Sequence, residues 1–424
     1  MANMAAAGNS DGSTRQSEEN GDRLSDLPDN ILHHILSFLN TNHIVQTSVL
    51  SRRWRSQWGN VHALNFHAPH HRHIRQAKFR EHVVQFLSRR GGPDDSSAAV
   101  SSVTIDVTNT VWELETDLFD TVMKYARTNL RRLGVHGSNL ATFLYADFEK
   151  LAASLTAHGH HESLEALELA RCSLQDGDAF GSVGFISLTN LELRGCTFSS
   201  CCDPFVGIPR LNRLKLDSCS LSRCSLKISG LELLSLEISG VYSVRGIDVV
   251  APKLKSFVFH GYSAECLENL ELPSLDRAVV RVCWGDHRRG PDTAALIQKN
   301  EEYMKQLRGL RNAKSLALRF DKIYYWKWKE HEFPFNNMKS AMESEASPFT
   351  RLKILRVEYP QDPQPIALHD HVIRYFFERS SNAEEKIVKF EKGKNVLNNA
   401  PYVVKLVAPE LRNLSFFHSF ETMN

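Results

Sequence analysis

The sequence predicts an α/β fold in which a short N-terminal unit of three helices precedes a long, curved solenoid of strand-bearing repeats. Two observations predict this arrangement. Apolar residues recur at helical spacing between residues 22 and 58, and a pattern of leucines closed by a cysteine recurs three times in tandem between residues 164 and 219. With 424 residues, 42% of them hydrophobic, the chain is long enough to bury a large core.

The helical unit lies in the run DRLSDLPDNILHHILSFLNTNHIVQTSVLSRRWRSQW, residues 22 to 58. Its first helix carries two apolar lines, one through residues 31, 35 and 38 and one through residues 32, 36 and 39. Pro28 suits the first helical turn, Asn40 or Thr41 can cap the second helix, and Ser51 can cap the third. Roughly 40 residues cannot bury this much apolar surface among themselves, so another protein or the rest of this chain must cover part of it.

This run resembles an F-box in several residues at fixed spacing: Leu27-Pro28, Ile31/Ile35, Phe38-Leu39, Val45/Val49, Leu50-Ser51 and Arg53-Trp54-Arg55. The resemblance implies a trihelical element that docks onto the Skp-type adaptor of a cullin–RING ubiquitin ligase. We predict that the adaptor-binding residues are Leu27, Pro28, Ile31, Leu32, Ile35, Leu36, Leu39, Val45, Val49, Leu50 and Trp54. The alternative is a self-contained helical hairpin packed on the downstream domain.

Four segments follow from the composition along the chain. Residues 1–21 are polar, lack the apolar core of a signal peptide and predict a disordered leader. Residues 22–66 are assigned to the F-box and residues 67–99 to a helical linker, with a helix over 72–90 that ends at Gly91-Gly92-Pro93. Residues 100–424 are assigned to the solenoid.

The charge balance and the cysteines narrow the class of protein. A formal net charge of +2 favours neither nucleic acid nor an anionic membrane as a partner. The sequence contains no run of about 18 apolar residues, so no membrane span is predicted. Without a secretion signal, the eight cysteines are expected to be reduced thiols. We therefore expect a protein of the cytoplasm, the nucleus or both.

The repeat is L-x-x-L-x-L-x-x-C, with full copies starting at Leu164, Leu188 and Leu211. Looser copies lie at 100/103/105, 130/133/135, 231/234/236, 254/257/259, 275/278/280, 313/316/318, 352/355/357 and 411/414/416. This is the leucine-rich-repeat template, and each copy predicts one short strand on the inner wall of the solenoid.

Spacings between copies widen toward the C-terminus, which predicts insertions near 321–349 and 359–400. The second insertion contains an amphipathic helical pattern over residues 366–379. An F-box followed by irregular repeats resembles the plant-type F-box/leucine-rich-repeat proteins. The segment after Ser347 fits the C-terminal FBD module of many such proteins only in part, and it is not assigned to that module.

Signatures of catalysis and of metal binding are weak in this sequence. There is no phosphate-binding loop, no G-x-S-x-G elbow, no H-E-x-x-H motif and no RING-type series of cysteines and histidines, so we predict neither an enzyme nor a cofactor. Cys172, Cys196 and Cys219 close three repeats, where thiols pack under the turn. The histidines at 67, 70, 71 and 73 are expected in a solvated loop, so no metal site is predicted.

Residues that alternate with the buried leucines should face a client protein on the inner wall. The predicted client-binding residues on the strands are Arg213, Lys215, His260, Arg277, Arg281, Arg319 and Arg356. Their positive bias toward the C-terminus suggests an acidic or phosphorylated ligand, against the alternative of a mixed, solvated face. Tyr325, Trp326 and Trp328 form either a further recognition surface or an inserted loop whose rings fold back on the adjacent repeat.

Together these features predict a substrate-recognition subunit of an SCF-type (cullin–RING) ubiquitin ligase with no catalytic residues of its own. The F-box would bind the adaptor, and the repeats would bind the protein to be ubiquitinated. Two alternatives remain open from the sequence: a receptor gated by a small molecule on the same architecture, and an interaction scaffold that works outside any ligase.

Overall fold

The structure, a computed structural model, describes residues 24, 26–68, 76–90, 99–126, 129–138, 146–175, 180–199, 203–261, 267–282, 309–320, 349, 351–359, 385–390 and 402–406. The leader, the histidines at 70, 71 and 73, the insertion aromatics Tyr325, Trp326 and Trp328, the helix over 366–379 and the repeat copy at 411/414/416 lie outside these residues.

Three short helices with two 3-10 turns form the N-terminal helical unit: α1 (Asp29–Ser37), α2 (Thr41–Gln46), η1 (Thr47–Val49), α3 (Arg52–Gln57) and η2 (Trp58–Asn60). The predicted caps are confirmed. The Asn40 side chain accepts a hydrogen bond from the backbone N–H of His43, and Ser51 Oγ accepts one from the N–H of Trp54. Pro28 lies just before the first helical residue, where its missing N–H costs nothing.

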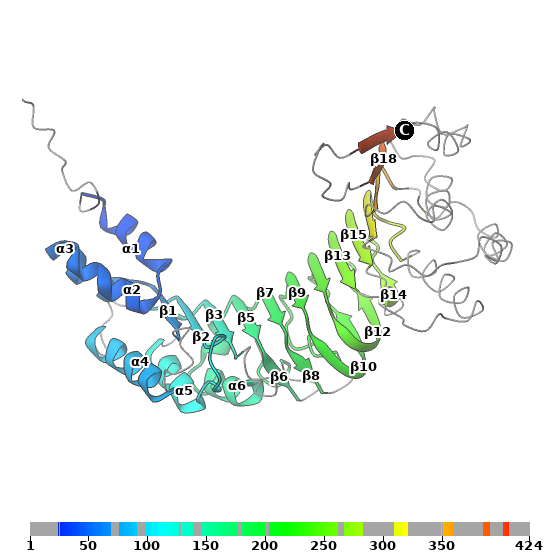
Figure 1. The fold of residues 1–424 in the computed structure, drawn as a ribbon. Helices are drawn as coiled ribbons and strands as arrows, with labels where there is room; N and C mark the ends of the chain where they lie inside the picture. The colour runs from blue at the N-terminus through cyan, green and yellow to red at the C-terminus, as the bar shows by residue number, and fades with distance from the viewer. Residues whose placement is uncertain are drawn as a thin grey trace, which may run out of the picture.

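Thirteen strands form one long sheet along the inner side of an arc (Figure 1). All neighbours pair in parallel except the last two. In spatial order the strands are β1 (Ala63–His67), β2 (Ser102–Asp106), β3 (Arg132–His136), β5 (Ala166–Ala170), β7 (Asn190–Arg194), β9 (Arg213–Asp217), β11 (Ser235–Ser239), β13 (Ser256–Gly261), β15 (Arg277–Val282), β16 (Ser315–Phe320), β17 (Ile354–Tyr359), β18 (Glu385–Phe390) and β19 (Tyr402–Leu406).

The convex side changes character along the arc (Figure 1). The first repeats return through the helices α4 (Gln76–Arg90), α5 (Thr116–Ala126), α6 (Phe148–Ala157) and α7 (His160–Ser163). The later repeats return through a second parallel sheet of β4 (Ala146–Asp147), β6 (Cys172–Leu174), β8 (Thr197–Phe198), β10 (Ser220–Ser229), β12 (Tyr242–Val250) and β14 (Leu267–Glu271). Repeats of 20 to 24 residues are too short to include a helix on the convex side, so the chain crosses that side as an extended strand.

A continuous apolar core runs between the inner sheet and the convex layer, from Leu64 in β1 to Leu355 in β17. The predicted cysteines Cys172, Cys196 and Cys219 are buried in it as free thiols. The Sγ atoms of Cys196 and Cys219 each lie 3.4 Å from a carbonyl oxygen of the preceding repeat. This confirms the expectation that these thiols pack under the turns.

The structure confirms the α/β class and most of the repeat copies, but one copy was placed in the wrong register. The sequence pattern was read as 231/234/236, whereas Leu233, Leu236 and Ile238 are the buried residues. Leu236 pairs with Leu214 and Ile238 with Leu216 in the sheet, so the ladder decides the register. Leu231 is 75% exposed.

The boundaries of the solenoid also differ from those expected. Its first strand, β1, lies within the 22–66 segment assigned to the F-box. At the other end, β18 lies within the segment 359–400 that was expected to be an insertion, and it continues the sheet beside β17. His67 does not lie in a loop, because it ends β1 and its Nδ1 is 3.3 Å from Asp106 Oδ2.

Gly207 marks a tight crossing between two convex turns. A Cβ atom at Gly207 would overlap the backbone of Gly181 and lie 2.9 Å from the carbonyl carbon of Phe180. We expect Gly207→Ala to lower the free energy of unfolding by about 1–3 kcal/mol, because two backbones must separate. Urea unfolding followed by circular dichroism would measure this, with Gly59→Ala as the control, since no atom lies within 4 Å of its Cβ position. If the two variants are equally stable, the backbones at Gly207 and Gly181 are not in close contact.

Candidate functional site: an apolar patch and a charged inner face

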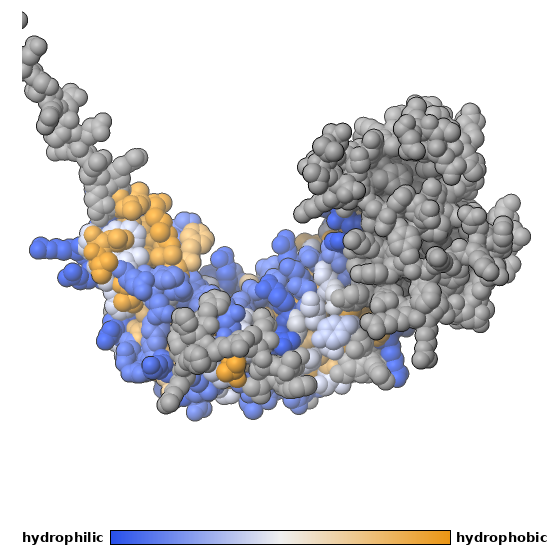
Figure 2. All heavy atoms as spheres, viewed as in Figure 1, coloured by the Kyte–Doolittle hydropathy of each residue, from blue (hydrophilic) through white to orange (hydrophobic). Residues whose placement is uncertain are grey.

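Large hydrophobic side chains are exposed together on the N-terminal helical unit. Figure 2 shows hydrophobic residues gathered over these helices, at the end of the arc. Val49 is 83% exposed and Phe38 is 74% exposed. We call this surface the apolar patch, and it consists of Leu24, Ile31, Phe38, Val45, Val49 and Leu50.

The two apolar lines of α1 differ in burial. Leu32 and Leu36 are fully buried, and they form a small core with Ile44, Trp54 and Val61. The line that carries Ile31 and Phe38 instead points to solvent. One helix thus serves both the core of the unit and its surface.

This division changes the set of residues predicted to bind the adaptor. Ile31, Val45, Val49 and Leu50 are exposed, as an interface requires, and so is Pro28. Leu27, Ile35 and Leu39 are partly buried and pack against the small core. Leu32, Leu36 and Trp54 are corrected to core residues, because at 3% exposure or less they have no surface to offer a partner. Phe38 and Leu24 were missing from the predicted set; the helical spacing of Phe38 from Ile31 could have identified it.

Polar contacts hold the helices that carry the patch. Asp29 at the start of α1 accepts hydrogen bonds from Arg53 and Gln57 on α3. The hydrogen bond from Arg53 lowers the pKa of Asp29 below its ordinary value. His33 is also within hydrogen-bond distance of Gln57, at 2.6 Å. These contacts fix α1 against α3 from outside the small core.

The helical unit is also joined directly to the solenoid. The side-chain N–H groups of Asn65 in β1 donate to the carbonyl oxygens of Ser37 and Leu39, at 2.9 and 3.1 Å. Trp58 packs against both the small core and the solenoid core. The apolar patch therefore has a fixed position relative to the first repeats.

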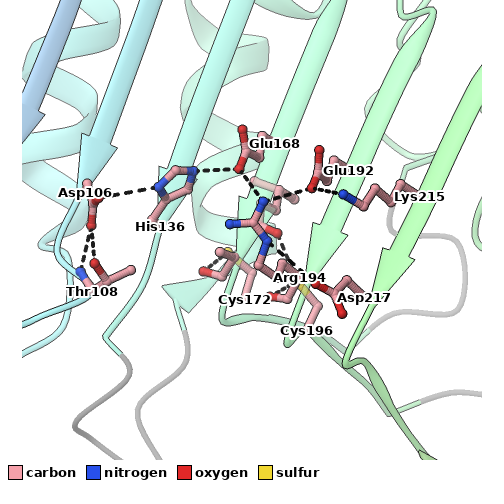
Figure 3. A network of polar contacts seen from close by, with 12 residues as sticks. Asp106, Thr108, His136, Glu168, Cys172, Glu192, Arg194, Cys196, Lys215 and Asp217 are labelled. Carbon is pink, nitrogen blue, oxygen red and sulfur yellow. Dashed lines mark hydrogen bonds and ion pairs between the residues drawn. The ribbon is translucent and has the colours of Figure 1, made fainter. Parts of the chain in front are cut away.

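The inner face of the early repeats carries a continuous polar network across five strands (Figure 3). We call it the inner-face network, and its members are Asp106, His136, Glu168, Glu192, Arg194, Lys215 and Asp217. His136 bridges Asp106, at 3.7 Å, and Glu168, at 3.1 Å.

Arg194 continues the network from Glu168. Its Nη2 lies 3.2 Å from Glu168 and 2.8 Å from Glu192, and Glu192 in turn lies 3.1 Å from Lys215. Arg194 thus lies between the carboxylates of Glu168 and Glu192, which are in register on neighbouring strands, and its positive charge offsets their repulsion.

The network shifts the pKa values of its buried members. Burial by itself would lower the pKa of His136, but Asp106 and Glu168 raise it to about 9. Burial would likewise raise the pKa of Asp106, yet hydrogen bonds from His136, His67 and Thr108 hold it far below the ordinary value. His136 is therefore a cation at neutral pH, held between two carboxylates.

The predicted client-binding residues divide between the two halves of the inner face. Lys215 is paired with Glu192 in the network, and Arg213 is exposed beside it on β9. The other five belong to the later strands: His260 on β13, Arg277 and Arg281 on β15, Arg319 on β16 and Arg356 on β17.

The described residues contain no group of three or more His, Cys, Asp or Glu side chains arranged to hold a metal ion. None of the helices described is both long and apolar enough to cross a membrane.

Two family comparisons match this architecture. The F-box domain family matches residues 24–64, and the At1g61320/AtMIF1 LRR domain family matches residues 121–280. The first match covers the helical unit and its apolar patch. The second covers the inner-face network except Asp106, and it extends through β13 into β15.

Curated relatives of this chain have names that combine an F-box with leucine-rich repeats. The F-box/LRR-repeat protein At3g03360 of Arabidopsis thaliana is 28% identical over 56% of this chain and 47% of its own length. The F-box/FBD/LRR-repeat protein At2g04230 of the same plant is 30% identical over 57% of the chain and 54% of its length. The putative F-box/FBD/LRR-repeat protein At4g03220, also from that plant, is 26% identical over 75% and 67%. The chain thus spans about half the length of the first two relatives.

Proposed function

We propose that this chain, which is similar to F-box/LRR-repeat proteins of Arabidopsis thaliana, is the substrate-recognition subunit of an SCF-type ubiquitin ligase. In this proposal the F-box binds a Skp-type adaptor and, through it, the cullin–RING core. The repeats bind the protein to be ubiquitinated. The proposal includes neither a nucleic acid nor a membrane as partner, and it places the protein in the cytoplasm or the nucleus.

The exposed apolar patch is the observation that carries this proposal. Val49, Phe38 and Leu50 are each more than half exposed and lie on one small helical unit. A contiguous apolar surface of this kind on a protein marks a site where a partner buries it. An apolar helical face is also the kind of surface that a groove in a partner protein accepts.

The rigid junction supports a mechanism based on proximity. Asn65 and Trp58 fix the F-box to the first repeats, so an adaptor on the patch and a client on the inner face are held at a set separation. Holding two reactants together raises their effective concentration and replaces an encounter in solution. Ubiquitin transfer itself is performed by other subunits in this proposal.

Reconstitution of the full chain with a purified Skp-type adaptor and cullin tests the assignment. We expect the three proteins to elute together in size-exclusion chromatography, and the chain without adaptor to leave the cullin unbound. If the folded chain elutes separately from the adaptor, the ligase assignment fails and an interaction scaffold becomes the better explanation.

A further inference from the structure

The turns that lead into the later inner strands carry an excess of positive charge. We call these turns, each with the first residue of its strand, the entry rim: residues 209–213, 231–235, 252–256, 273–277, 311–315 and 351–354, before β9, β11, β13, β15, β16 and β17. They contain nine basic and two acidic residues. The corresponding described turns before β3, β5 and β7 contain two of each, and Arg131 there is 2.7 Å from Glu165. Since the whole chain has a net charge of +2, the excess on the entry rim is local.

The two acidic residues of the entry rim are already paired, whereas four of its arginines are not. Glu232 lies 2.6 Å from Lys253, and Asp276 lies 2.7 Å from Lys314 and 3.8 Å from Lys255. Exposed guanidinium groups with neither an ion pair nor a hydrogen bond to any residue that the structure describes are those of Arg210, Arg213, Arg277 and Arg311. An anionic partner would supply the charge that these four lack.

The surroundings of the entry rim do not cancel its charge. In the next row of the inner face, on the same six strands, two basic residues outnumber Glu237. In the last row, Asp217 and Glu358 match two arginines, with His260 counted as neutral. On the convex side, Glu271 ends β14 shortly before the rim and offsets only part of the excess. The four unpaired arginines therefore lie in a region that stays positive.

Strand register fixes the spacing of two of these arginines. Arg213, Ser235, Ser256 and Arg277 are in register as the first residues of four neighbouring strands. Three steps of about 4.8 Å place the backbones of Arg213 and Arg277 about 14 Å apart, which an extended segment covers in about four residues. Two separate anionic groups about four residues apart match this pair better than one group with a double charge.

Exposed leucines lie between the two arginines. Leu231 is 75% exposed and Leu234 is 42% exposed. The N–H of Leu234 donates to the carbonyl oxygen of Asn212, and its own carbonyl oxygen accepts from the N–H of Lys255, so Leu234 lies between the turns before β9 and β13. None of the described residues of the rim is aromatic, as stacking on a base requires. Apolar contacts beside single charges therefore favour a polypeptide segment over a nucleic acid.

We propose that the entry rim binds an acidic, extended segment of the client protein. Two carboxylates about four residues apart pair with Arg213 and Arg277, and an apolar side chain between them contacts Leu234. A guanidinium group accepts a carboxylate through two parallel hydrogen bonds, which fixes the position of the segment as well as its charge. This inference rests on the proposed function, because it names the class of client and the edge of the sheet that recognises it.

The test uses the purified full chain and two immobilised degenerate peptide libraries. One has two glutamates about four residues apart with a leucine between them, and the other has glutamines in place of the glutamates. At low salt we expect the glutamate library to retain the chain about five- to tenfold better, and the preference to shrink as salt is added. Arg213→Glu and Arg277→Glu should each abolish the preference, whereas Arg277→Lys should keep part of it, since it keeps the charge. Leu234→Ser should weaken retention on both libraries.

Arg132→Glu is the matched control, because Arg132 is likewise the exposed first residue of an inner strand, β3, outside the entry rim. It should keep the full preference for the glutamate library. Each variant is also checked by circular dichroism and for adaptor binding, and Arg277→Gln replaces Arg277→Glu if the latter does not fold.

A folded chain that binds adaptor but retains both libraries equally would overturn this inference alone, and so would an equal loss of preference in Arg132→Glu. If the unaltered chain does not bind the adaptor, the proposed function fails instead. Stronger retention on immobilised single-stranded DNA than on the glutamate library would also overturn the inference, because the rim would then recognise a nucleic acid.

Discussion

Replacement of Val49 by aspartate is expected to weaken binding of the Skp-type adaptor by about 30-fold or more. Val49 is 83% exposed at the end of η1 and lies beside Leu50 in the apolar patch. Loss of a central apolar contact typically costs about 2 kcal/mol or more in binding free energy, and an added carboxylate must also be desolvated. Titration calorimetry of the full chain with purified adaptor would measure the change.

Two control variants separate this interface effect from general effects of substitution. Leu231→Asp makes the same kind of change at an equally exposed side chain in the solenoid, so adaptor affinity should stay unchanged. Leu32→Ala removes a fully buried side chain from the small core. It should lower the free energy of unfolding by about 2–5 kcal/mol. Unchanged adaptor affinity in Val49→Asp would move the interface away from the apolar patch.

The second large effect is a loss of stability at alkaline pH that depends on His136. Its pKa rises from 6.5 in an unfolded chain to about 9 in the folded one. A raised pKa stabilises the fold fully below pH 6.5, and this stabilisation is lost as the pH rises through about 9. The shift of about 2.5 pKa units corresponds to about 3.5 kcal/mol at most, since each pKa unit is worth about 1.4 kcal/mol.

Urea unfolding of the full chain at pH 6.5 and pH 9.5 would show this dependence. The unaltered chain should lose stability between the two, whereas His136→Gln should be less stable at pH 6.5 and nearly insensitive to the same change. His43→Gln, at an exposed position of α2, should behave like the unaltered chain. If His136→Gln keeps the full pH dependence, the bridge between Asp106 and Glu168 does not hold the charge that we assign to it.

The repeat architecture was predictable because its cause is local. A strand with buried residues at alternate positions needs the leucine template, and Leu191/Leu193 or Leu214/Leu216 are buried as that template requires. The error at residues 231–238 has an equally local cause. Leucines at 231, 233, 234 and 236 fit the template in more than one register. Pairing with Leu214 and Leu216 on β9 selects one of them.

The sequence by itself determined that helices precede repeats, that cysteines close three of the turns and that α1 carries two apolar lines. Only the tertiary structure decided which line is a surface, because Leu32 and Ile31 are equally apolar, and packing against Trp54 and Val61 buries one of them. Only strand register could bring His136 between Asp106 and Glu168, or Arg281 beside Arg319, since these residues are about 30 or more positions apart in the chain. Spacing within a repeat is a short-range property, whereas the charge pattern of the inner face arises from how successive repeats stack.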